Sequence, residues 1–80
     1  MAATPGMKSV IVSFPNGTPD SVVQKAKDEI RNNGGKVTVE YTLIPGFAAD
    51  APEELLNRVK TLDSSHPATV EDDTIVSVNQ

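Results

Sequence analysis

Three consecutive carboxylates, Glu71, Asp72 and Asp73, are the densest group of side chains in this chain that could do chemistry. Such a cluster can bind calcium, remain solvated in a loop, or accept backbone N–H groups from helix N-termini of a partner. A calcium ion needs about six to eight oxygen ligands, and this loop lacks the alternating Asp and Asn residues and the internal glycine of such a site. We therefore expect no metal ion, and the other two interpretations stay open.

The residues after this cluster have high β-propensity. Thr74 to Val78 contains two valines and an isoleucine, and no charged residue follows Asp73. A terminal segment of this kind exposes apolar side chains and unpaired backbone groups unless another surface covers them. We predict that Thr74 to Val78 forms the last strand and that a partner covers the end of the chain.

No group of residues is typical of an enzyme. His66 is the single histidine, and the chain has no cysteine to complete a metal site or a catalytic dyad. Gly34-Gly35 precedes a predicted strand, whereas a phosphate-binding loop precedes a helix. The serines lack the sequence context of a nucleophile: Ser9, Ser13, Ser21, Ser64, Ser65 and Ser77. The sequence thus predicts a protein that is not an enzyme and uses no cofactor.

Composition narrows the class of partner. The chain has 80 residues, enough for one small domain, and its net charge is -4, with 7 basic and 11 acidic residues. Nucleic-acid binding depends on Lys and Arg, so a nucleic acid is not expected as the partner. The chain has no run of apolar residues long enough for a membrane span, and residues 1–7 lack the pattern of a secretory signal. We expect a cytoplasmic monomer, with passage to the vacuole left open.

The first half of the sequence predicts a strand followed by a helix. In the strand from Lys8 to Phe14, the apolar residues alternate, with Ile11 on the face opposite the others. Thr18-Pro19 resembles a helix start, with a capping hydroxyl before proline, and Asn32-Asn33-Gly34-Gly35 resembles a helix end. The predicted apolar stripe is Val22, Val23, Ala26 and Ile30, and the predicted solvent-facing residues include Lys25, Lys27, Asp28 and Arg31.

The second half predicts two strands, a helix and the last strand. Lys36 to Leu43 alternates, which would place Val37, Val39, Tyr41 and Leu43 toward the core. Phe47 to Ala49 would be a short strand, and Asp50-Ala51-Pro52 would start a helix that ends near residues 63–65. Its predicted apolar stripe is Leu55, Leu56, Val59 and Leu62.

The resulting order β-α-β-β-α-β predicts an α+β, ferredoxin-like domain. Right-handed crossovers give a four-stranded antiparallel sheet in the order 4-1-3-2, with both helices on one face and the other face bare. This architecture also occurs in RNA-binding domains, metal carriers and small-ligand regulatory modules. The negative charge disfavours RNA and the absence of cysteine disfavours metal carriage. A small-ligand or regulatory module stays open as an alternative.

Several short motifs, taken together, resemble a known family. They are Gly34-Gly35-Lys36-Val37, Glu40-Tyr41, Ile44, Gly46-Phe47-Ala48-Ala49 and Val70-Glu71-Asp72-Asp73. Their order and spacing are similar to those of the propeptides of subtilisin-like serine proteases and of the small fungal inhibitors of proteinase B. The similarity runs from about Lys8 to Asn79, nearly the whole chain.

The resemblance implies a subtilisin-like serine protease as partner. Members of the family dock through the bare sheet face and lay the carboxyl-terminal segment in the substrate cleft like a bound product. By this likeness residues 1–6 are a lead-in, 7–75 the inhibitor domain and 76–80 the cleft-binding tail. Glu71 and Asp73 would cap two helix N-termini of the enzyme. The family also includes propeptides that assist folding of their own protease domain, so a residual chaperone activity is expected.

The resemblance also implies a register for the tail in the cleft. Val76 would occupy the P4 position, Ser77 P3, Val78 P2 and Asn79 P1. Gln80 lies one residue beyond the usual end, so it would overhang the catalytic serine. A shift by one residue would instead place Gln80 at P1 and Ser77 at P4. We favour the overhang because a serine gains little from an apolar pocket.

Overall fold

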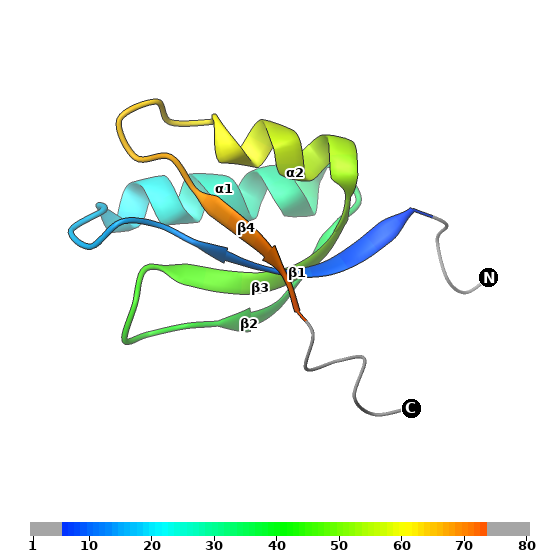
Figure 1. Ribbon diagram of the computed structural model, residues 1–80, viewed down its shortest axis with the longest axis horizontal. Coiled ribbons are helices and arrows are strands. Elements are labelled where there is room, and N and C mark those ends of the chain that lie inside the picture. The colour runs from blue at the N-terminus through cyan, green and yellow to red at the C-terminus, as the bar shows by residue number, and fades with distance from the viewer. Residues whose placement is uncertain (1–5, 74–80) are drawn as a thin grey trace.

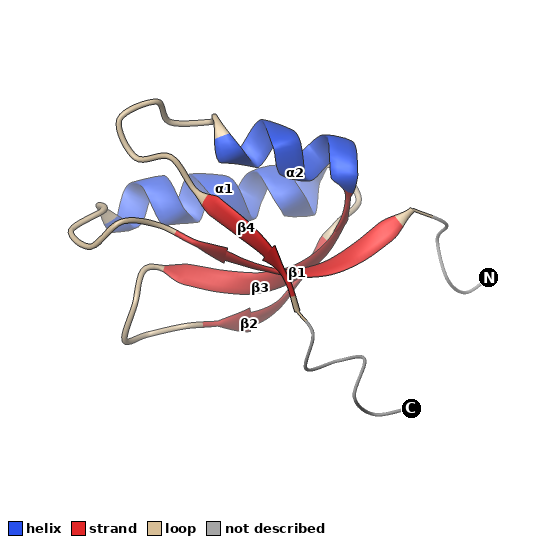
Figure 2. Cartoon of the chain, in the orientation of Figure 1, coloured by secondary structure: helices blue, strands red, loops and turns tan. Residues whose placement is uncertain are grey.

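A computed structural model describes residues 6–73 and has four strands and two helices. Its elements are β1 (Met7–Ser13), α1 (Asp20–Asn32), β2 (Lys36–Glu40), β3 (Gly46–Pro52), α2 (Glu53–Lys60) and β4 (Thr69–Asp72). The sheet is antiparallel in the order β2-β3-β1-β4, and both helices lie on one face (Figure 1). This is the predicted order 4-1-3-2 in the opposite direction, so the α+β ferredoxin-like fold is confirmed (Figure 2).

The core lies between the sheet and the helices. The predicted alternation in β1 is confirmed, since Val10, Val12 and Phe14 are buried while Ile11 lies on the other face, half-buried. The helices contribute further buried side chains, listed with those of β3: Val23, Ala26, Ile30, Phe47, Ala49, Ala51, Leu55, Leu56 and Val59. Burying each of the larger ones is worth about 1.5–3 kcal/mol, so this single layer accounts for most of the stabilisation.

Both helix starts differ in detail from the prediction. The Thr18 hydroxyl donates a hydrogen bond of 2.6 Å to the Pro15 carbonyl and closes the preceding turn, so α1 begins after Pro19 without a side-chain cap. Before α2, the Asp50 carboxylate accepts from the Ser9 hydroxyl across the sheet instead of capping the helix. In both cases the side chain expected to cap the helix forms its hydrogen bond with a group outside the helix instead. The end of α2 at Lys60 also precedes the predicted end at 63–65.

The last described strand lies earlier than predicted. The fourth strand of the described sheet is β4, Thr69–Asp72, which the sequence analysis did not predict, whereas Thr74 to Val78, predicted to form this strand, lie outside the described residues. Val70 is opposite Val12 and packs against the core, which determines the pairing of β4 with β1. The acidic residues of β4 are tolerated because it is an edge strand.

The alternation predicted from Lys36 to Leu43 fails after Val37. An irregularity between Val37 and Val39 shifts the pairing with β3, so that Val37 is opposite Ala49 and Val39 is opposite Ala48. A bulge of this kind reverses the face on which later side chains lie. Val39 is therefore 49% exposed, and Leu43, which lies beyond the end of β2, is 95% exposed.

The bulge also brings Glu40 to the helix side of the sheet, where it pairs with Lys27. Lys27, expected on the solvent side, is only 8% exposed, and its Nζ lies 2.8 Å from Oε1 of Glu40. Arg31 contacts the other oxygen at 3.3 Å. The hydrogen bond and the charge of Lys27, with a smaller effect from Arg31, hold the pKa of Glu40 below its ordinary value. The ion pair thus ties the edge strand β2 to α1.

This ion pair predicts a specific pH dependence of stability. A carboxylate whose pKa is lowered by folding stabilises the protein above its unfolded pKa, and this stabilisation is lost as the pH falls through the folded pKa. We expect Glu40→Gln to lower the free energy of unfolding at pH 7, where Lys27 loses its charged partner, and to change it little near pH 3. Chemical unfolding of both proteins from pH 7 to pH 3 measures this difference.

The lowered pKa of Asp63 contributes in the same acidic range, but it is common to both proteins and cancels in the comparison. Asp28→Asn serves as control. Asp28 lies in α1, the helix that carries Lys27, and its 4.0 Å contact with Arg31 is exposed to solvent. A difference between wild type and Glu40→Gln that stays constant over the whole range would contradict the assignment.

Candidate functional site

The bare face of the sheet carries a continuous row of side chains that spans all four strands. Residues that are directly opposite each other in neighbouring antiparallel strands share a face. The register therefore places on this face, in order from β4 to β2, Glu71, Ile11, Ala48 and Val39. With strands about 4.8 Å apart, the row is about 14 Å long. A carboxylate at one edge is thus joined by apolar residues to an exposed valine at the other edge.

A second, polar row runs beside the first. The backbone N–H of Asp73 donates to the Ser9 carbonyl at 2.9 Å, which continues the pairing of β4 with β1 by one residue. The Ser9 hydroxyl donates to Oδ1 of Asp50 at 2.7 Å, and Asp50 is opposite Lys36. Hydrogen bonding between side chains across β1 and β3 holds the Asp50 carboxylate in place on the bare face.

The acidic triplet is divided between the two faces of the sheet. Glu71 is opposite Ile11 on the bare face, and Asp72 is opposite Val10 on the helix-facing side. Asp73 follows in the same register and returns to the bare face, about 7 Å along the strand from Glu71. The two residues predicted from the family likeness are thus brought together on one face, while the middle carboxylate is directed away.

The described chain continues from this position toward the predicted cleft-binding residues. The structure brings Glu71 and Asp73 to the edge strand, at the end of the described part. Val76, Ser77, Val78, Asn79 and Gln80 lie outside the described residues. Their proposed positions in a cleft remain predictions.

Some residues of this face were missed by the sequence analysis. Ser9 had no binding role assigned, Asp50 was expected to cap a helix, and Val39 was expected in the core. The alternation of Ser9 and Ser13 with the buried Val10 and Val12 is a signal that could have revealed the polar side of β1. Nothing in the sequence could have revealed Val39, because its orientation depends on the bulge.

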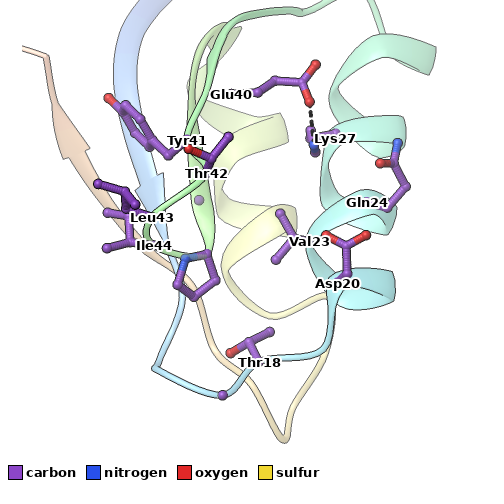
Figure 3. A pocket seen from close by; sticks show the side chains of 13 residues that line it. Thr18, Asp20, Val23, Gln24, Lys27, Glu40, Tyr41, Thr42, Leu43 and Ile44 are labelled. Atoms are coloured by element: carbon purple, nitrogen blue, oxygen red, sulfur yellow. Dashed lines mark hydrogen bonds and ion pairs between the residues drawn. The ribbon is translucent and has the colours of Figure 1, made fainter.

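A separate hollow of about 580 Å³ lies between α1 and the β2–β3 hairpin (Figure 3). Its polar lining includes Lys27 and Glu40, which already bind each other at 2.8 Å, and Figure 3 shows Val23 and Asp20 on the helix side. In residues 6–73 every buried side-chain nitrogen or oxygen has a hydrogen-bond partner. The charge of Lys27, which is buried, is therefore already paired with Glu40, and the small-ligand or regulatory-module alternative stays a prediction.

The contacts of His66 indicate a structural role in the turn after α2. Oδ1 of Asp63 accepts the Ser65 N–H at 2.9 Å and lies 3.4 Å from Nδ1 of His66. The Ser65 N–H, followed by the contact with His66, lowers the pKa of Asp63. These contacts close the turn after α2. Within residues 6–73 no three His, Cys, Asp or Glu side chains are grouped to hold a metal ion.

Neither α1 nor α2, the helices of the described part, is long and apolar enough to cross a membrane. Both helices lie on one side of the sheet, so neither covers the bare face (Figure 1).

Comparison with known proteins gives independent information. No family model matches the chain. An uncharacterized protein of Neurospora crassa is 44% identical over 70 residues, which cover 88% of this chain and 73% of that protein. Serine proteinase inhibitor IA-2 of Pleurotus ostreatus is 33% identical over 69 residues, covering 84% of this chain and 91% of the inhibitor. Protease B inhibitor 2 of Saccharomyces cerevisiae is 32% identical over 73 residues, which cover 90% of this chain and 97% of that inhibitor.

The two inhibitors match this chain over nearly their whole length. The resemblance found in the sequence and the identity with these proteins point to the same group. The chain belongs to the fungal proteinase B inhibitor family.

Proposed function

We propose that this protein inhibits a subtilisin-like serine protease by docking the bare sheet face on the enzyme and placing residues 76–80 in its substrate cleft. The observation that carries the proposal is the position of Glu71 and Asp73 on one bare face, next to the point where the chain continues toward residue 76. The names of the similar inhibitors support the class of partner. The protein acts by binding and performs no catalysis.

The paired carboxylates determine what the enzyme surface must offer. Helix N-termini present backbone N–H groups that lack partners within their own helix, and they attract negative charge. Two carboxylates about 7 Å apart along a strand fit two such sites on neighbouring helices. Each contact contributes about 0.5–2 kcal/mol when it is partly buried.

The tail supplies the contacts in the cleft. Seven extended residues, 74–80, reach about 23–25 Å from Asp73, enough to leave the edge of the sheet and follow a cleft. Backbone groups of the tail pair with the cleft walls as an added strand, and Val76 in an apolar S4 pocket contributes about 1.5–3 kcal/mol. Ordering the tail costs about 1–2 kcal/mol per residue, so contacts of the folded body must offset part of that cost.

The same binding accounts for inhibition and for a chaperone effect. With Asn79 at P1, the peptide bond that crosses the catalytic serine is Asn79–Gln80, and removal of Gln80 would leave the tail in the cleft like a product. A body that binds only the native surface of the protease also favours the folded form of that protease by mass action. A residual ability to assist folding of the protease is expected from the same contacts.

Deletion of residues 76–80 tests the role of the tail. We expect the truncated protein to lose inhibition of a purified subtilisin-type protease, because the cleft contacts are removed. The thermal unfolding midpoint should change little, because the core listed above lies within residues 10–59. Enzyme inhibition and thermal unfolding of the same samples, with deletion of Gln80 alone as control, give both values. Undiminished inhibition by the truncated protein would reject the mechanism.

The division of the acidic triplet allows a matched test of the carboxylates. We expect Glu71→Gln and Asp73→Asn each to weaken inhibition by about 2- to 30-fold, which corresponds to about 0.5–2 kcal/mol. Asp72→Asn is the control, because it removes the same charge from the helix-facing side of the same strand. Inhibition constants at low and high salt measure the effect. Equal losses in all three variants would indicate attraction by net charge alone.

The register of the tail is tested by two single substitutions. We expect Val76→Asp to weaken inhibition by at least about 10-fold, because a carboxylate enters an apolar pocket in place of a valine. Gln80→Ala should have almost no effect if Gln80 overhangs the catalytic serine. The reverse ranking of the two inhibition constants would place Gln80 at P1 and Ser77 at P4.

A further inference from the structure

The β2–β3 hairpin holds the exposed large hydrophobic side chains of the described part of the chain. They are Val39, Leu43 and Ile44, which are 49%, 95% and 50% exposed. Large apolar side chains that are exposed singly need no explanation, but a group of them on one hairpin is typical of an interaction site. We call these three residues, together with Tyr41, the hairpin patch.

The hairpin patch continues the bare face. Val39 ends the row that begins at Glu71, about 14 Å away across the strands. The backbone N–H of Tyr41 donates to the Gly46 carbonyl at 3.2 Å, so the hairpin continues in the same pairing beyond β2. Figure 3 shows Tyr41, Leu43 and Ile44 on the side of the hairpin away from Val23 and α1. The segment from Glu40 to Ile44 lines a shallow hollow of about 410 Å³.

The hairpin patch and the tail lie at opposite ends of the face. Ser13, at the end of β1, is opposite Gly46 next to the hairpin, whereas Asp73 pairs with Ser9, closer to the beginning of β1. The chain therefore continues toward residues 74–80 from the end of the sheet that is remote from the hairpin. A partner that covers the whole face would meet the carboxylates near its cleft and the hairpin patch away from its cleft.

We propose that the hairpin patch binds an apolar area on the same protease, outside the substrate cleft, and helps to determine which protease is inhibited. This inference rests on the proposed function. The same enzyme is the occupant because the patch is continuous with the face that carries Glu71 and Asp73. Two carboxylates offset only part of the cost of ordering a tail, and burial of apolar side chains supplies what is missing. The selectivity between proteases that the hairpin patch provides does not depend on the sequence of residues 76–80.

The test is the full-length double variant Leu43→Ser/Ile44→Ser, measured against several purified subtilisin-type proteases. Both positions are exposed, so the thermal unfolding midpoint should stay near that of wild type. We expect inhibition of the most strongly inhibited protease to weaken by about 10- to 100-fold, with faster dissociation, and the ranking of the proteases to change. Lys60→Ser is the control, because Lys60 is an exposed residue at the end of α2.

The outcomes separate this inference from the proposed function. If wild type inhibits and the double variant inhibits equally well, the hairpin patch is not a protease contact and the inference is overturned. If wild type inhibits none of the proteases, the proposed function fails and the inference fails with it. Sedimentation of wild type and variant is measured in parallel. A wild-type dimer that the double variant dissociates, with inhibition unchanged, would identify a second copy of the chain as the occupant.

Discussion

The pairing of β4 with β1 is the constraint on which the rest of the binding face depends. Val70 lies opposite Val12 and packs on the core, so its neighbour Glu71 must lie on the bare face. A slip of one residue would turn Val70 to solvent and bring Glu71 to the apolar side of the sheet. A carboxylate at the half-buried position of Val70 would lose part of its hydration, and the apolar contact of Val70 with the core would be lost as well. One half-buried valine thus fixes the orientation of the acidic residues that follow it.

The centre of the sheet provides a rigid support for this edge. β3 contains small residues, and a side chain at Gly46 would place its Cβ only 2.5 Å from the Val12 carbonyl oxygen. Glycine therefore allows the end of β1 and the hairpin to approach closely. At the far edge, Lys27 and Glu40 connect β2 to α1. The two edges of the face are held by different means, apolar packing at β4 and an ion pair at β2.

The sequence predicted the parts of the fold that depend on the periodicity of apolar residues. It missed the parts in which a side chain has a choice between alternative hydrogen-bond or strand-pairing partners. The alternation of Val10, Val12 and Phe14 predicted β1, and the helical spacing of Val23, Ala26 and Ile30 predicted α1. Right-handed crossovers in the order β-α-β-β-α-β then predicted the strand order. Motif likeness then indicated Glu71 and Asp73 before their common face was known.

The errors have identifiable physical causes. A bulge after Val37 exchanged the faces of Val39 and Glu40, and the buried position of Lys27 follows from that exchange. The sequence analysis placed the last strand at Thr74 to Val78 because of the high β-propensity there, and it did not predict β4. The acidic residues of β4 are unfavourable in strands in general but are tolerated in an edge strand. Neither effect can be read from local pattern alone, because each depends on which strand lies alongside.

Under the proposed function, Glu71 can bind the protease only while β4 is paired with β1, so binding depends on the folding of this edge of the sheet. β4 has four residues and is held mainly by β1, so local opening of this edge would separate Glu71 from the rest of the face. A ligand that binds only the closed form stabilises it, by about 4.1 kcal/mol at a concentration 1,000 times its dissociation constant. Cleavage by a protease requires opened chain, so its rate follows the population of the open form when opening is fast. The inhibitor is then protected most by the enzyme that binds it best, which is why a small domain with one thin core can persist beside a protease.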